Sequence, residues 1–108
     1  MKPFLVFGLL LLLVACSVKL VKPTQTDVDR VSGKFPGVTL SDLNQGRTLY
    51  EQQCGNCHSF YKPEDKTEEQ WEQIVPNMVK EANKKAGKIV LGSKEQDLIY
   101  RYLVAMRG

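Results

Sequence analysis

The sequence contains one histidine, one tryptophan and three cysteines in 108 residues. Its formal net charge is only +3 and no block of like charge appears; nucleic-acid binding needs a clustered basic face, so no such partner is expected. The apolar share is 43%, and it falls to about 37% without the first fifteen residues. So short a chain forms one domain with a small core. A large enzyme with its own substrate domain is excluded, and no small-molecule substrate is expected.

The one long apolar run is residues 4–15, which follow Lys2. Twelve residues are too few to span about 30 Å of hydrocarbon, so we interpret residues 1–15 as a signal peptide. Residues 13–16, LVAC, resemble the lipobox of bacterial lipoproteins, which implies a diacylglycerol on Cys16. An ordinary signal peptide is the alternative. The resemblance implies a location in the cell envelope facing the periplasm. In the sorting pattern of such lipoproteins, Ser17 at the second position of the mature chain, in place of Asp, favours the outer membrane over the inner membrane.

Residues 16–37 have the composition of a flexible tether that starts at the lipidated Cys16. They include two prolines and two glycines and show no helical period. About twenty such residues have a root-mean-square span on the order of 25 Å and reach at most about 70 Å. The alternative is that part of this segment packs on the folded domain, which we place at residues 38–108.

A first helix is expected over residues 42–53, with Ser41 as its N-cap and with Leu43, Gly46 and Tyr50 on one face. Glycine inside a helix costs about 1 kcal/mol relative to alanine. A close crossing of two helices at Gly46 would explain why glycine is present there.

Two more helices follow. One begins with the capping box Thr67 to Gln70, and Gly87 is expected to end it. Pro76 interrupts its apolar face, so we expect a kink or a break. The last begins with the box Ser93 to Gln96 and turns Leu98, Ile99, Tyr102, Leu103 and Met106 inward. No hairpin signal competes, so the predicted class is all-α, with three main helices.

Between the first two helices stands Cys54-Gly55-Asn56-Cys57-His58. Cys-x-x-Cys-His is the attachment motif of c-type haem: two thiols three positions apart add to the two vinyl groups, and the adjacent histidine ligates the iron. A thioredoxin-like redox pair would need a helix that begins at Cys54, whereas the helical pattern ends there. A structural zinc site normally has four ligands, and only Cys54, Cys57 and His58 remain once Cys16 carries a lipid. A plain disulfide between Cys54 and Cys57 is the remaining alternative.

The chain resembles the small monohaem class I cytochromes c, and more closely the short bacterial lipoprotein cytochromes. The resemblance covers roughly residues 40–103, through Gly46, Tyr50, the Cys54 to His58 motif, Trp71 and Met78. It implies a cytochrome c-like fold around one covalent haem c with its iron. It also implies that the first and last helices cross, with Gly46 and Tyr50 facing residues 98–102.

The sixth iron ligand is open. His58 is the only histidine, so a second histidine ligand from the same chain is excluded. Many class I cytochromes carry the ligand methionine in a loop before the last helix, but residues 87–92 contain none. Closer lipoprotein relatives use a methionine in a Trp-x-x-x-Val-x-x-Met helix, which implies Met78. A core role for Met78, ligation by Met106 or lysine, and an open site are the alternatives.

The sequence therefore predicts an electron carrier rather than an enzyme: a membrane-tethered monohaem cytochrome that shuttles single electrons between redox protein partners. Cys54 and Cys57 hold the haem, His58 and Met78 ligate the iron, and Cys16 carries the lipid. The alternatives are a haem-based binder or sensor of small gases with an open or displaceable sixth position, and a thiol redox lipoprotein without haem.

Overall fold

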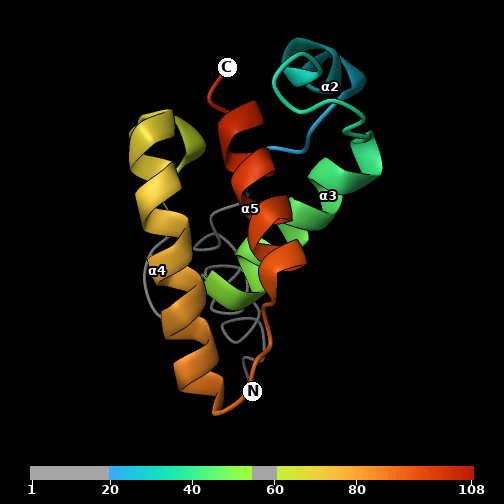
Figure 1. The fold of residues 1–108 in the computed structure, drawn as a ribbon. Coiled ribbons are helices and arrows are strands. Elements are labelled where there is room, and N and C mark those ends of the chain that lie inside the picture. Colours follow the sequence, from blue (N-terminus) through green and yellow to red (C-terminus); the bar gives the residue numbers. More distant parts are fainter. Residues whose placement is uncertain (1–19, 55–60) are drawn as a thin grey trace, which may run out of the picture.

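The structure is a computed structural model that describes residues 20–54 and 61–108. These residues form four α-helices and contain no strand, which confirms the all-α prediction for the described part of the chain. The helices are α2 (Gln25–Val31), α3 (Leu40–Leu49), α4 (Glu68–Ala86) and α5 (Ser93–Ala105), with a π-helical turn at Tyr50–Cys54 and a 3-10 turn at Pro63–Asp65. Figure 1 shows α4 and α5 running alongside each other, with α3 crossing α5 on its other side.

The closest approach in the fold is the crossing of α3 and α5 at Gly46. A Cβ atom added to Gly46 would lie 2.1 Å from the carbonyl oxygen of Leu98 and 2.8 Å from Cβ of Tyr102. Any larger residue would therefore force the two helices apart. The crossing confirms the predicted reason for this glycine and the predicted pairing of its face with residues 98–102.

Helix α4 begins and ends where the sequence predicts. The Thr67 hydroxyl accepts from the Gln70 amide at 3.1 Å and the Gln70 side chain accepts from the Thr67 amide at 2.8 Å, which completes the capping box. Gly87 ends the helix with φ of 71°, in the left-handed region.

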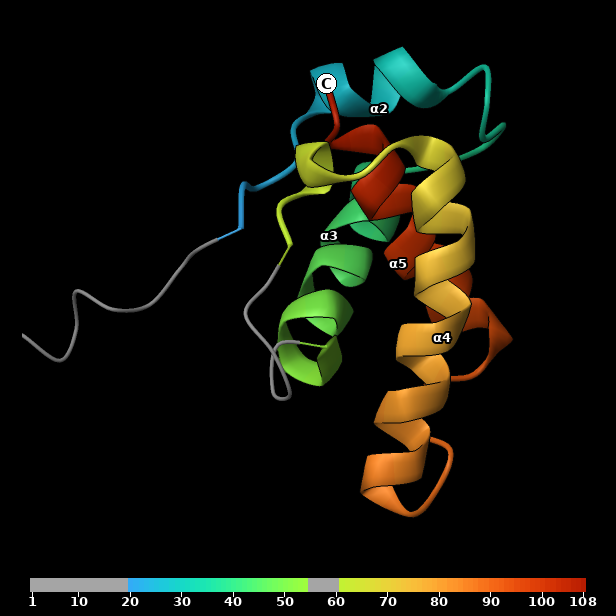
Figure 2. The ribbon, with the colours of Figure 1, turned by 90° about the vertical axis from the view of Figure 1, so that its left-hand side faces the viewer.

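Pro76 does not break α4, so of the two expected outcomes, a kink or a break, the break is wrong. The helix is continuous from Glu68 to Ala86 (Figure 2). Pro76 is exposed, so water can satisfy the carbonyl group that loses its intrahelical donor, while Val75 and Val79 stay buried. Burial of that face holds the helix together across the proline.

The starts of two other helices differ from the prediction by one or two residues. Thr39, not Ser41, caps α3 by accepting from the Asp42 amide at 3.1 Å. At α5 the cap is Gly92, whose amide donates to Glu95 at 2.8 Å. Helix α3 ends at Leu49, and the π-helical turn carries the chain on to Cys54.

The segment predicted as an extended tether differs most. Residues 20–37 include α2, which packs against α3 and α5. Val28, Val31 and Phe35 are buried, at a spacing that places them on one side of the helix and its following turn. Their spacing of three and four residues is helical, but three positions, the last of them beyond the helix, give a weak signal in the sequence. In the fold they are enough to dock a short helix. The packed alternative therefore holds for this part of the segment.

Two apolar cores result. We call the one between α3, α4 and α5 the central core and the one beneath α2 the outer core. The central core consists of Leu20, Tyr50, Trp71, Val75, Val79, Ala82, Leu91, Ile99, Tyr102 and Leu103. The outer core consists of Val28, Val31, Phe35, Val38, Leu43, Val104 and Ala105.

Candidate functional site

Two of the predicted site residues can be placed. Cys54 is half-buried at the end of the π-helical turn, and Met78 is half-buried on α4. Cys57 and His58 of the motif, and the expected lipid attachment residue Cys16, lie outside the described residues. The structure therefore describes the first residue of the motif and the favoured sixth ligand.

Cys54 and Met78 both pack against the central core, although they come from different elements. Met106, the residue that follows α5, also packs against this core. The π-helical turn that ends in Cys54 packs on α3 and α4. Met78 is carried by α4, one of the two helices that this turn contacts, whereas Met106 follows α5.

A π-helical turn leads into the motif. Wider turns of this kind are frequent at functional sites because they change the direction of the side chains that follow. Its first residue, Tyr50, is 1% exposed and anchors the turn in the central core. The chain thus reaches Cys54 from a fixed point rather than from a loose helix end.

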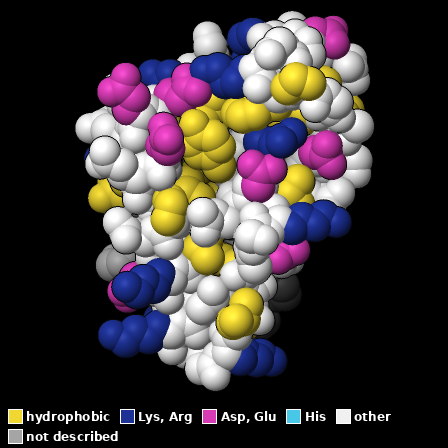
Figure 3. All heavy atoms as spheres, viewed as in Figure 1, with side chains coloured by type: hydrophobic (Ala, Val, Ile, Leu, Met, Phe, Trp, Pro, Cys, Tyr) yellow, Lys and Arg dark blue, Asp and Glu magenta, His cyan; other side chains and the backbone are white. Residues whose placement is uncertain are grey.

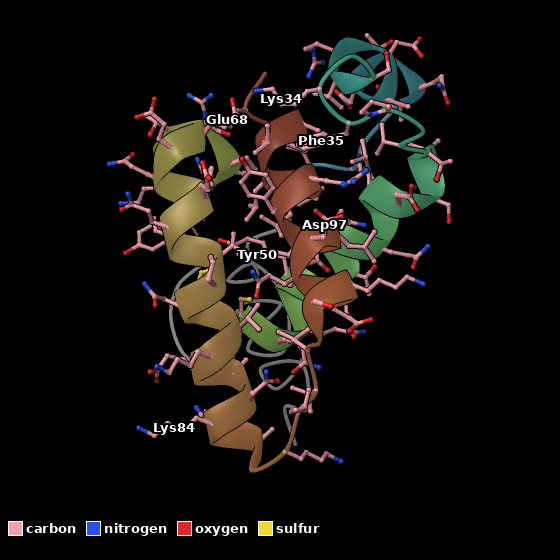
Figure 4. The ribbon with its side chains drawn as sticks, viewed as in Figure 1. Lys34, Phe35, Tyr50, Glu68, Lys84 and Asp97 are labelled. Carbon is pink, nitrogen blue, oxygen red and sulfur yellow. The ribbon has the colours of Figure 1, made fainter. Side chains whose placement is uncertain are left out.

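Two buried aromatic side chains fix the chain where it leaves the motif. The Tyr50 hydroxyl donates to the Tyr61 carbonyl at 2.9 Å, and the Trp71 indole N–H donates to the Pro63 carbonyl at 2.8 Å. The two rings meet edge to face, with centroids 6.3 Å apart and planes at 86°. Figure 4 shows Tyr50 between α4 and α5. The chain on both sides of residues 55–60 is therefore anchored on the same aromatic pair.

The buried tyrosines remain hydrogen-bond donors at all physiological pH values. Burial, and to a smaller extent the nearby Cys54, raises the pKa of Tyr50 well above its usual range. Burial also raises the pKa of Tyr102 to about 12. The Tyr102 hydroxyl donates to the Val21 carbonyl at 2.9 Å, so it holds the N-terminal segment as Tyr50 holds the exit from the motif.

Asn83 is an important residue that sequence reasoning missed. Its side-chain oxygen accepts from the amides of Val90 and Leu91 at 2.8 and 2.9 Å, and its side-chain nitrogen donates to the Leu91 carbonyl at 2.9 Å. These bonds fold the loop after α4 back onto the helix and seat Leu91, which is 1% exposed, in the central core. An asparagine four residues before the terminating Gly87 is the one signal in the sequence.

Two further features are absent from the described residues, a metal-binding cluster and a membrane-spanning helix. In residues 20–54 and 61–108, no three side chains of His, Cys, Asp or Glu converge to hold a metal ion. Over the same ranges, no helix has the length and apolar character needed to cross a membrane.

No family model matches this chain, and neither a curated protein nor a solved structure resembles it at a significant level.

Proposed function

We propose that the chain is a membrane-tethered monohaem c-type cytochrome, an electron carrier rather than an enzyme. The observation that carries the proposal is the joint packing of Cys54 and Met78 against the central core, from two separate elements. A Cys-x-x-Cys-His motif begins at one of them, and a thioether stands at the other. This donor set, two thiols followed by histidine, with a methionine on the same apolar core, is the set that haem c uses.

Cys54 and Cys57 would hold the haem through thioethers, and His58 and Met78 would ligate the iron. When bound, haem supplies a one-electron ferric and ferrous couple. The residues of the chain would set its surroundings. Tyr50 and Trp71 brace the chain on both sides of residues 55–60 and would keep water away on the side of the central core. Half-buried Ile74, one turn before Met78, extends the apolar surface of α4.

The cellular setting follows from the proposed lipid on Cys16. The protein would sit in the bacterial envelope facing the periplasm, with the outer membrane favoured, and would exchange electrons with redox protein partners. Covalent haem attachment to an exported apoprotein agrees with this setting, because in bacteria the attachment is completed outside the cytoplasm.

Denaturing electrophoresis tests the covalent haem directly. The full chain, expressed with a haem attachment system, should keep haem peroxidase staining in the gel, and a variant with Cys54→Ser and Cys57→Ser should lose it. A wild-type band without haem would refute the cytochrome proposal and leave the thiol redox lipoprotein. Cys16→Ser, which keeps both motif thiols, is the matched control and should stain like the wild type.

The sixth ligand is tested by near-infrared absorption of the ferric protein. Met78→Ala should lose the weak band that sulfur ligation produces, whereas Met106→Ala, on the same core, should retain it. The reduced Met78→Ala protein should also bind carbon monoxide. Retention of the band in Met78→Ala would move the ligand elsewhere, and carbon monoxide binding by the wild type would favour the gas-binding alternative.

A further inference from the structure

The folded part of the chain starts much nearer to Cys16 than the sequence suggests. Leu20 is 6% exposed and belongs to the central core, which also contains Tyr50 and Tyr102. Its carbonyl accepts from the Arg47 Nε at 3.4 Å, and the next carbonyl, of Val21, accepts from the Tyr102 hydroxyl. The chain is therefore attached to both α3 and α5 from residue 20 onward.

Further contacts attach the rest of this segment. The Arg30 guanidinium donates to the Ala105 carbonyl at the end of α5 at 2.7 Å. Lys34 forms an ion pair with Glu68 at the start of α4, and Figure 4 shows these two side chains together. Contacts to three helices in succession leave no part of residues 20–34 to act as a flexible spacer.

We propose that the face around Val21 and Lys22 lies against the lipid surface and that the domain holds a fixed orientation there. The proposal rests on the lipid at Cys16 that the proposed function includes. Only four peptide units separate Cys16 from Leu20, and they reach about 14 Å when fully extended. Such a short connection keeps the start of the fold at the membrane.

The chemistry of this face suits a phospholipid surface. Val21 is 67% exposed although it is apolar, and the exposed Lys22 follows it. An apolar side chain next to a cation fits the boundary between acyl chains and anionic headgroups.

The opposite end of the molecule has a different surface. The end of α4 and the loop after it lie far from α2 and from the start of the described chain (Figure 2). Lys84, Lys85 and Lys88 are exposed there, and Ile89 is 80% exposed. Figure 3 shows basic side chains at this end. In the proposed orientation this end points away from the membrane.

Lysine footprinting on vesicles tests the orientation. The full lipidated holoprotein is bound to vesicles of phosphatidylethanolamine and phosphatidylglycerol and treated with a water-soluble amine-acetylating reagent, and modification is read by mass spectrometry. Lys22 should react several-fold less than in the Cys16→Ser protein mixed with the same vesicles. Lys84 and Lys88 should react equally in both samples.

A spacer variant provides the matched control. About twelve Gly and Ser residues inserted between Lys19 and Leu20 add a root-mean-square span on the order of 20 Å, so the reactivity of Lys22 should return. Equal reactivity of Lys22 on and off vesicles would overturn the orientation while leaving the lipid anchor intact. Protection that persists with the spacer would show that the face binds lipid by itself, which supports the orientation. Failure of the wild type to bind vesicles would refute the anchor itself. Protection in native envelopes without protection on vesicles would identify a protein as the occupant and overturn the proposal.

Discussion

The α3–α5 crossing and the outer half of α4 are held in place by different means. At the crossing the backbone of Gly46 touches the backbone of α5, and Leu43, Ile99 and Leu103 are fully buried around it. Beyond Pro76, α4 buries only Val79 and Ala82, and the three hydrogen bonds of Asn83 anchor its end to the following loop.

This difference separates a part of the fold that is complete from a part with apolar surface left to cover. Close approach of the two backbones at Gly46, with buried side chains around it, fixes the crossing. Met78, beyond Pro76 on α4, packs against the central core but stays half-buried, as does Ile74 one turn before it. In the proposed function the haem would cover this remaining apolar surface and provide the contacts that a small core lacks.

The largest effect should come from filling the crossing. Gly46→Val should lower the free energy of unfolding by about 3 kcal/mol or more, because added atoms meet backbone that cannot move aside. Urea unfolding followed by circular dichroism measures the loss. Gly33→Ala is the matched control, since a Cβ at Gly33 meets nothing within 4 Å. Similar midpoints for the two variants would show that the crossing is less rigid than described.

Removal of the Asn83 side chain should have the next largest effect. Asn83→Ala leaves the amides of Val90 and Leu91 without their acceptor, at a cost of about 2 kcal/mol. Hydrogen exchange at those two amides should speed up together with the loss in urea stability. Asn77→Ala, which removes one exposed bond to Gln73 in the same helix, should change little. If both variants behave alike, Asn83 does not anchor the loop.

The parts of the fold that the sequence predicted depend on neighbours in the chain. Thr67 and Gly87 act within one turn of their own helix, and Gly46 stands out because glycine is costly in a helix interior. Helix α2 could not be predicted, because its docking depends on partners such as Ala105, 75 residues from Arg30. Asn83 was missed for a similar reason, because nothing in the sequence shows that its side chain binds the backbone of Val90 and Leu91.

The candidate site likewise contains residues that a local pattern predicts and residues whose role depends on the fold. Spacing alone identified Cys54 as part of a motif, because the chemistry of attachment is local. The packing of Met78 on the same core as Cys54 depends on how α4 and the π-helical turn meet, which no local pattern specifies. The roles of Tyr50 and Trp71 as donors to the chain beyond the motif were likewise visible only in three dimensions.

Single hydroxyl deletions should distinguish the two tyrosine anchors. Tyr50→Phe and Tyr102→Phe each remove one hydrogen bond and should each cost about 1 kcal/mol. Their local effects should differ: amide exchange should speed up at Tyr61 and Lys62 in the first variant and at Val21 and Lys22 in the second. Exchange that rises equally at both places in either variant would mean that the tyrosines stabilise the core in general and do not anchor separate segments.

The smallest effect should be an acid-induced loosening of α2. Burial raises the pKa of Asp27, but hydrogen bonds from Thr24 and Arg30 outweigh it, so the pKa lies below its ordinary value of 3.8. A carboxyl with a lowered folded-state pKa stabilises the fold above its unfolded pKa, and this contribution is lost as the pH falls through the folded value. The α2 amide signals in NMR spectra should therefore shift and broaden below about pH 4, while those of α3 and α5 at the Gly46 crossing should not.

Asp27→Asn should remove this pH dependence, and Asp29→Asn, at an exposed site on the same helix, should keep it. Loss of α2 at the same pH in the Asp27→Asn protein would assign the transition to another group.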